Sequence, residues 1–164
     1  FREYGFRLVP QGDGRLGEQL HAVTERCIDQ GAEQVVIVGS DSPTLLDRHL
    51  QAAFDGLADN EVVLGPSFDG GYYLIGLQRA REGIFEGIDW STEAVLKQTV
   101  SRCRDAGTLP KLLEFWYDVD TFVDLRRLRF HLLDYLVPRD RRVAPRTARM
   151  LDSLQEAGLF GDGA

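Results

Sequence analysis

Two short acidic stretches of the sequence have the residue types of a metal site. The first is VVIVGSDSPTL, residues 35–45, in which Asp41 follows an apolar run and a glycine. The second is YDVDTFVDL, residues 117–125, in which Asp118 and Asp120 stand two positions apart. Alternate residues of an extended chain share a face, so these two carboxylates can point the same way. Oxygen ligands of this kind suit Mg²⁺ or Mn²⁺. Water molecules and substrate phosphates complete the coordination of these ions.

The setting of Asp41 favours a binding site, because ligands of open α/β sheets bind beyond the carboxyl ends of the strands. The apolar run 35–38 is typical of a buried parallel strand, and Asp41 comes three residues after its end. Gly39 permits a sharp turn and Pro43 prevents the strand from continuing. A helix N-cap or an Asx-turn explains the same aspartate equally well when this stretch is considered alone.

A third stretch, GPSFDGGYYLIGL at residues 65–77, joins two apolar runs through the tripeptide DGG, residues 69–71. The glycines permit positive φ angles and a close approach of the backbone to a ligand. An ordinary turn accounts for the same tripeptide. Capping of a helix likewise accounts for Asp120, which directly precedes the predicted cap residue Thr121.

Strands alternate with helices along the chain, which predicts an α/β fold with a mainly parallel sheet flanked by helices. Hydrophobic periodicity predicts helices over 14–30, 44–57, from a cap at Ser91 or Thr92 to Gly107, from Thr121 to Leu136, and over 147–157. Apolar runs predict strands over 35–38, 62–64, 72–77 and 111–115. Residues 1–137 are expected to form one domain, to which a connector and helix over 138–164 also belong.

Composition narrows the class of protein. The 164 residues are 43% hydrophobic and 27% charged, as in globular proteins. A net charge of −7 and a pI near 4.9 argue against general binding of nucleic acid, which requires a basic surface. No apolar run approaches the ~20 residues that span a bilayer. The two cysteines indicate no disulfide framework, so a reducing cytoplasm is the expected location.

The three acidic stretches, together with IDWSTEAVLKQT at 88–99 and QGDGRLGEQL at 11–20, resemble the motifs of the DUF2064 family in order and spacing. The resemblance covers residues 10–128. Members of this family are uncharacterised proteins assigned as glycosyltransferases of the GT-A, nucleotide-diphospho-sugar transferase fold, some of them in arsenosugar biosynthesis. The resemblance implies the same type of fold and a transferase that uses a nucleotide or nucleotide-sugar donor.

The resemblance also implies roles for individual residues. Enzymes of the wider superfamily use an aspartate after the central strand as a metal ligand, and Asp41 matches this position. A D-T-x-x-D-L segment completes the metal site in several of them, and Asp120 matches its first carboxylate. Asp41 and Asp120 are therefore expected to be catalytic metal ligands, with Asp118 as a further ligand of Mg²⁺ or Mn²⁺. The residues expected to bind substrate are Ser40, Ser42, Asp69, Gly70, Gly71 and Trp90.

The sequence departs from the family at its beginning. In the family, a strand and a loop that reads approximately Pro-x-x-Gly-x-x-Lys-Thr-Arg-Leu hold the nucleotide, and nothing in residues 1–15 matches that loop. We therefore expect either that the amino-terminal unit is missing or that this is a shortened relative. Three functions stay open: glycosyl transfer, which the resemblance favours, nucleotidyl transfer by the same fold, and a non-catalytic binding module. The sequence does not indicate the acceptor or the oligomeric state.

Overall fold

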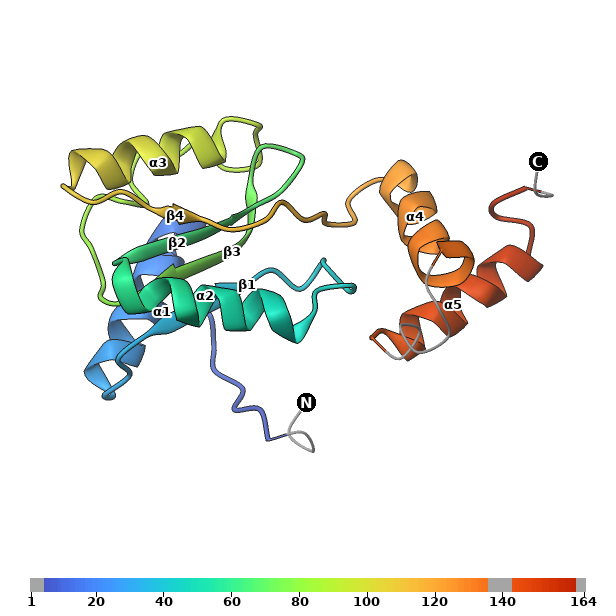
Figure 1. The fold of residues 1–164 in the computed structure, drawn as a ribbon, viewed down its shortest axis with the longest axis horizontal. Helices are drawn as coiled ribbons and strands as arrows, with labels where there is room; N and C mark the ends of the chain where they lie inside the picture. The colour runs from blue at the N-terminus through green and yellow to red at the C-terminus, as the bar shows by residue number, and fades with distance from the viewer. Residues whose placement is uncertain (1–4, 136–142, 162–164) are drawn as a thin grey trace.

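The computed structural model describes residues 5–135 and 143–161, in which a four-stranded sheet is flanked by helices (Figure 1). The strands are β1 (Val35–Val38), β2 (Val62–Pro66), β3 (Tyr72–Leu77) and β4 (Lys111–Leu112). The helices are α1 (Leu16–Asp29), α2 (Asp47–Asp59), α3 (Val95–Asp105), α4 (Phe122–Arg129) and α5 (Pro145–Glu156), and a π-helical segment η2 (Phe130–Tyr135) continues α4. The predicted α/β class is confirmed. None of the described helices is long and apolar enough to cross a membrane.

The prediction of a mainly parallel sheet needs a correction. The strand order is β1-β3-β2-β4, and β3 runs antiparallel to both β1 and β2, whereas β2 and β4 are parallel. The cause is a hairpin between β2 and β3, in which residues 67–71 reverse the chain and the Ser67 N–H donates to the Gly71 carbonyl at 3.1 Å. Two apolar runs separated by a short turn that contains glycine normally fold in this way.

The strand directions bring three separate loops to one edge of the sheet. Because β1, β2 and β4 share a direction, the residues that follow their carboxyl ends lie at the same edge. The predicted strand 111–115 forms regular ladder pairs only at Lys111 and Leu112. Beyond them the chain stays beside β2, because Trp116 forms a parallel bridge with Ser67.

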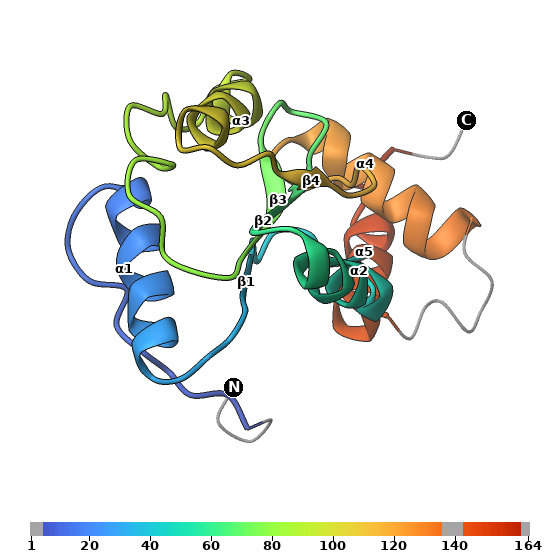
Figure 2. The ribbon, with the colours of Figure 1, turned by 60° about the vertical axis from the view of Figure 1, so that its left-hand side comes forward.

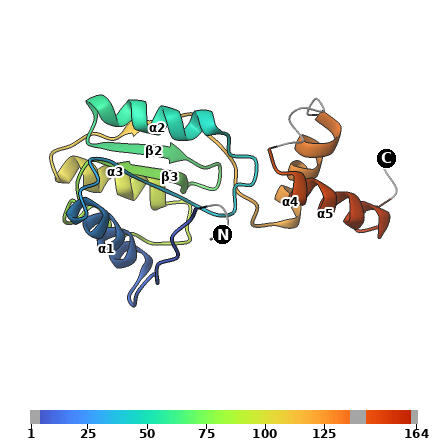
Figure 3. The ribbon, with the colours of Figure 1, turned by 90° about the horizontal axis from the view of Figure 1, so that it is seen from below.

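Helices cover both faces of the sheet, as Figures 2 and 3 show: α1 and α3 lie on one face and α2 on the other. Val62 and Leu64 of β2 pack in the apolar cluster on the α1 and α3 side, whereas Val63 packs with Leu57 of α2. This alternation is the two-residue period of a strand buried on both faces. The apolar core therefore consists of two layers, one on each face of the sheet.

A third apolar cluster joins the carboxyl-terminal helices to the end of the sheet. Leu128 of α4, Leu132 of η2 and Leu151 of α5 pack together with Tyr117, which follows β4. These helices form a lobe beside the sheet (Figure 1). The predicted boundary at 137 and 138 lies outside the described residues, and the assignment of the lobe to the same domain stays a prediction.

Of the five predicted helix starts, the cap at Thr121 is confirmed and the other four differ, α1 and α5 by two residues each. Thr121 caps α4 as predicted, because its hydroxyl accepts from the Asp124 N–H at 3.3 Å and the Asp124 carboxylate accepts from the Thr121 N–H at 3.1 Å. Helix α2 begins at Asp47 rather than Thr44: the cap residue is Leu46, whose N–H donates to Nδ1 of His49, and the Thr44 hydroxyl accepts from the Trp116 indole. Helix α3 begins at Val95, after an irregular stretch in which Ser91 has a φ of 64°.

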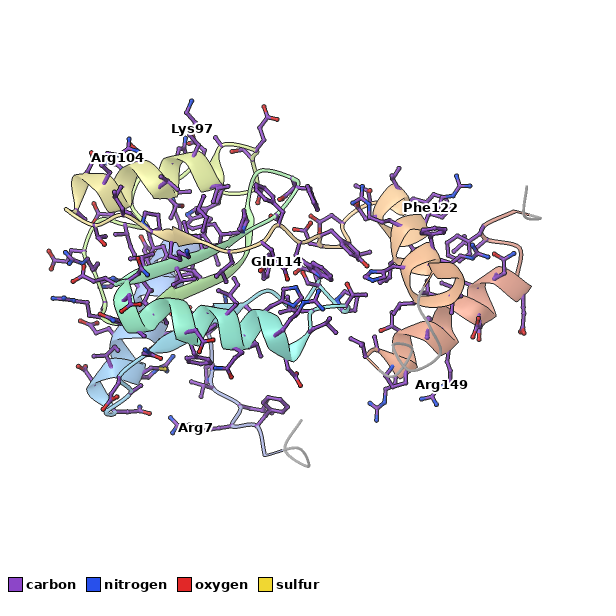
Figure 4. The ribbon with its side chains drawn as sticks, in the orientation of Figure 1. Arg7, Lys97, Arg104, Glu114, Phe122 and Arg149 are labelled. Atoms are coloured by element: carbon purple, nitrogen blue, oxygen red, sulfur yellow. The ribbon has the colours of Figure 1, made fainter. Side chains whose placement is uncertain are left out.

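His49 of α2 is buried, with 1% of its surface exposed. Its Nδ1 accepts from the Leu46 N–H at 2.9 Å, and its Nε2 lies 3.0 Å from Oε1 of Glu114, which Figure 4 labels. Burial lowers the pKa of His49 from 6.5, although the Leu46 backbone and the Glu114 carboxylate act in the opposite direction. The neutral imidazole is therefore the form that the fold stabilises.

We expect the protein to lose stability as the pH falls below 6.5. In this range the unfolded chain binds a proton at His49 while the folded chain does not, so the free energy of unfolding falls by up to about 1.4 kcal/mol per pH unit. The loss ends where the pH reaches the lowered pKa of the folded state. Denaturant unfolding of the wild type and of His49→Gln across this range would measure the effect. The variant should show the shallower pH dependence, and identical slopes would contradict the expectation.

Candidate active site

Three carboxylates from two loops converge at the edge of the sheet beyond β2. Asp69, Asp118 and Asp120 each offer an oxygen, and these three oxygens lie within 4.8 Å of one another. Asp69 belongs to the hairpin between β2 and β3, and the other two belong to the segment between β4 and α4. The structure thus brings together residues that are about fifty positions apart in the sequence.

The hairpin fixes the orientation of Asp69. The Ser67 hydroxyl and the Gly71 N–H both donate to Asp69 Oδ1, the second of them at 2.9 Å. This is an Asx-type turn, in which the side chain replaces a backbone acceptor. The two interpretations of residues 69–71, an ordinary turn and a binding site, are therefore compatible. The Asp69 carboxylate closes the hairpin and also lines the pocket described below.

Residues 116–120, which carry Asp118 and Asp120, are tied to two neighbouring elements. The Trp116 N–H donates to the Pro66 carbonyl of β2 at 3.0 Å. The Val119 N–H donates to the Asp41 carbonyl at 3.1 Å, and the Trp116 indole N–H donates to the Thr44 hydroxyl at 3.2 Å. The turn after β1 and the segment after β4 are consequently held side by side.

Asp41 lies close to the three carboxylates but outside their group. Its exposed side chain lines the same pocket, and its charge helps to raise the pKa of Asp118. Its effect on that pKa is smaller than the effects of Asp69 and Asp120. The structure therefore brings two of the three predicted metal ligands, Asp118 and Asp120, together with Asp69, which was expected to bind substrate.

Repulsion between carboxylates is a main electrostatic feature of the site. Burial raises the pKa of Asp118, and the negative charges of Asp69, Asp120 and Asp41 raise it further, while a backbone hydrogen bond acts in the opposite direction. Like charges this close to Asp118 disfavour its ionised form. A cation placed among these carboxylates would remove that repulsion.

A pocket of about 820 Å³ opens onto the carboxylates. Its acidic lining residues are Asp41, Asp69, Glu93, Asp118 and Asp120. No lysine, arginine or histidine belongs to the described residues that line it. The volume lies in the range of small-molecule and cofactor sites. Any anion that enters this pocket meets negative charge.

The residues predicted to bind substrate fall into two groups. Ser40, Gly71 and Trp90 line the pocket with Asp69, so they are placed to meet a ligand. Ser42 and Gly70 are not among its lining residues. Ser42 is buried, and its carbonyl accepts from the Leu45 N–H at 3.0 Å in the turn after β1. A role in binding substrate stays a prediction for all of these residues.

Gly70 has a structural role that the sequence did not reveal. Its φ is +91°, and a Cβ at this position would lie 2.3 Å from the Glu93 carbonyl oxygen. The Leu96 N–H donates to the Gly70 carbonyl at 2.8 Å. The absence of a side chain thus lets the hairpin approach Glu93 closely and support the start of α3.

Glu93 and Tyr72 are two of the lining residues that sequence reasoning missed. Glu93 was expected in the first turn of a helix, but it precedes α3 and lines the pocket. Tyr72 lines the wall beside Trp90, with their ring centroids 6.4 Å apart in an edge-to-face arrangement. Its position at the start of β3, directly after the glycine turn, is the signal that places it at this edge of the sheet.

The sequence is similar to that of a bacterial protein family. Residues 2–92 match the model of a family described as "Uncharacterized protein conserved in bacteria (DUF2064)". The chain belongs to the DUF2064 family. The predicted resemblance is therefore confirmed. No curated protein matches the sequence.

A solved structure adds the type of fold. The crystal structure of a "putative nucleotide-diphospho-sugar transferase" from Desulfovibrio desulfuricans G20 is similar to this DUF2064 chain, with 31% identity and a TM-score of 0.74. The match covers 87% of this chain and 64% of that one, so this chain spans less than two thirds of the other protein's length. The fold is consistent with the predicted GT-A, nucleotide-diphospho-sugar transferase type.

The contact at Gly70 leads to a prediction about stability. Gly70→Ala should lower the free energy of unfolding more than Gly107→Ala, because both glycines have a positive φ but only Gly70 has a neighbour in the space of a Cβ. We expect about 1–2 kcal/mol for the strained φ in either variant, and about 1–3 kcal/mol more at Gly70 for the displaced Glu93 backbone. Denaturant unfolding would measure both. Equal losses would show that the hairpin does not depend on this close approach.

Proposed function

We propose that this protein is a metal-dependent transferase whose donor is a nucleotide-activated sugar. The convergence of Asp69, Asp118 and Asp120 in a pocket without described basic lining residues is the observation that carries the proposal. The similarity to the Desulfovibrio structure supports the donor class. Membership of the DUF2064 family does not indicate the donor class, because the family has no characterised activity.

The charge of the pocket supports dependence on a metal. A nucleotide sugar carries a diphosphate, and the acidic side chains that line the pocket repel it. Two unit charges 4 Å apart interact by about 4 kcal/mol near a protein surface, so several such repulsions prevent binding unless a cation offsets them. No described lining side chain carries a positive charge. A divalent cation is the simplest group that meets this need.

The residues present fit Mg²⁺ or Mn²⁺. Both ions take carboxylate oxygens, and they keep positions for water and for phosphate. Asp69, Asp118 and Asp120 offer such a set. Burial raises the pKa of Asp118 most, and the like charges that raise it further are those that an ion would neutralise. Asp41 is proposed as a further ligand, because its carboxylate is close enough to Asp118 to affect that pKa.

Each part of the pocket has a role in this proposal. Asp118 and Asp120 hold the ion, and the hydrogen bonds from Ser67 and Gly71 keep Asp69 aimed at it. When bound, the ion would act as a Lewis acid toward the diphosphate and stabilise the charge that develops on the leaving group. Trp90 and Tyr72 form an apolar wall on which a ring of the substrate can pack.

The first test is thermal unfolding with Mn²⁺ or Mg²⁺ and a panel of sugar nucleotides. Ligand at about a hundred times its dissociation constant adds roughly 2.7 kcal/mol, which raises the midpoint clearly. The shift should require metal and should disappear in Asp120→Asn. Asp105→Asn, which changes an exposed aspartate at the end of α3, should keep it. A shift that is independent of metal, or that survives in Asp120→Asn, would contradict the proposal.

The repulsion in the site leads to a second expectation. Asp118→Asn removes one of the mutually repelling charges, so the metal-free variant should unfold at a higher temperature than the wild type. The same variant should lose the stabilisation by Mn²⁺. Thermal unfolding with a chelator and then with excess Mn²⁺ would measure both effects. A metal-free variant less stable than the wild type would show that Asp118 has a structural role instead.

The products distinguish glycosyl transfer from nucleotidyl transfer, which the fold also supports. Glycosyl transfer from a nucleoside diphosphate sugar releases a nucleoside diphosphate, whereas nucleotidyl transfer from a nucleoside triphosphate releases pyrophosphate. Separate assays for these two products, with a mixture of sugars and polyols as acceptors, would decide between them. Binding of the nucleotide without release of either product would favour the non-catalytic module.

A further inference from the structure

A hydrogen bond connects the carboxylate segment to the carboxyl-terminal helices. The Tyr117 hydroxyl and Nδ1 of His131 are hydrogen-bonded partners, and they come from the segment after β4 and from η2. Tyr117 is 7% exposed and belongs to the apolar cluster of the helical lobe. The contact therefore joins the lobe to the residue that directly precedes Asp118.

Further ring and cation contacts surround Tyr117. Trp116 stacks against it, with centroids 5.7 Å apart and an angle of 26° between the planes. The His131 ring lies 5.7 Å from Tyr117 and 6.0 Å from Trp116. The Arg127 guanidinium of α4 lies 5.8 Å from the centre of the Tyr117 ring. The ring is thus held between the sheet and the lobe.

The position of Tyr117 determines where the neighbouring carboxylates lie. Side chains of an extended chain alternate, so Tyr117 points into the lobe while Asp118 lines the pocket. At the other end of the segment, the Thr121 and Asp124 capping pair fixes the chain directly after Asp120. The segment that carries both carboxylates runs between Glu114 and Phe122, which are labelled in Figure 4.

We infer that Tyr117 and His131 are positioning residues, which set the affinity of the site for a divalent cation by holding Asp118 and Asp120 in place. The inference rests on the proposed function, since it requires that these carboxylates bind metal. It assigns the helical lobe a part in the site, although no residue of the lobe is in the carboxylate group. Residues that orient metal ligands without touching the ion typically change metal affinity by 10- to 100-fold when they are replaced.

The experiment compares two variants that each remove one buried hydroxyl. Tyr117→Phe removes the hydroxyl that contacts His131 and that also has a side-chain hydrogen bond with Thr44. Thr24→Val is the control, because the buried Thr24 hydroxyl donates to the Leu20 carbonyl of α1 at 2.8 Å and Thr24 is not among the lining residues of the pocket. Titration with Mn²⁺, followed by the electron paramagnetic resonance signal of the free ion, gives the dissociation constant of each folded protein. Denaturant unfolding without metal gives the stability of each.

We expect Tyr117→Phe to bind Mn²⁺ about tenfold more weakly than the wild type and Thr24→Val to bind it as the wild type does. His131→Leu should show the same loss as Tyr117→Phe. His131→Asn should recover much of the affinity, because an asparagine amide can place a polar group where Nδ1 stands. The double variant Tyr117→Phe/His131→Leu should lose less affinity than the sum of the two single losses, since both changes break the Tyr117–His131 contact.

The outcomes separate this inference from the proposed function. A wild-type protein that does not bind Mn²⁺ would overturn the proposed function, and the inference with it. A wild type that binds Mn²⁺, with Tyr117→Phe and His131→Leu of equal affinity to it, would overturn the inference alone. A purely structural role for the pair would lower the free energy of unfolding in these variants without changing the Mn²⁺ dissociation constant, and that result would also overturn the inference.

Discussion

The attachment of residues 116–119 to the turn after β1 and to β2 is the constraint on which the site depends. The Val119 N–H bonds to the Asp41 carbonyl, and the Trp116 N–H bonds to the Pro66 carbonyl. These are backbone contacts, so they fix the path of the chain whatever the neighbouring side chains are. Without them, the segment with Asp118 and Asp120 would have no defined place beside Asp69.

This arrangement concentrates negative charge, which the fold retains despite its cost. Burial and the acidic neighbours of Asp118 raise its pKa, and the described lining of the pocket offers no basic side chain. Clusters of this kind reduce stability, and natural proteins retain them mainly at functional sites. Hydrogen bonds and ring contacts hold the acidic segments in place. The Asx-type turn at Asp69, the cap at Thr121 and the clamped Tyr117 each hold one end of an acidic segment.

The hairpin between β2 and β3 connects the site to the rest of the fold. It supplies Asp69, reverses the chain so that β3 enters the centre of the sheet, and supports the start of α3 through Gly70. Gly70 of this hairpin therefore has a role in the backbone conformation. The predicted role of Gly70 in binding substrate has a structural explanation beside it, whereas Gly71 lines the pocket itself.

The sequence by itself determined the local structure of this DUF2064 protein. The helices, the strands β1 and β3 and the cap at Thr121 follow from periodicity and from residue types within a few positions, and the structure confirms them. Three features depended on contacts between distant segments: the direction of β3 relative to its neighbours, the engagement of Thr44 with Trp116, and the grouping of Asp69 rather than Asp41 with Asp118 and Asp120. Each was decided by the tertiary structure, because strand pairing places residues far apart in the sequence within reach of one another, and no local pattern encodes those distances.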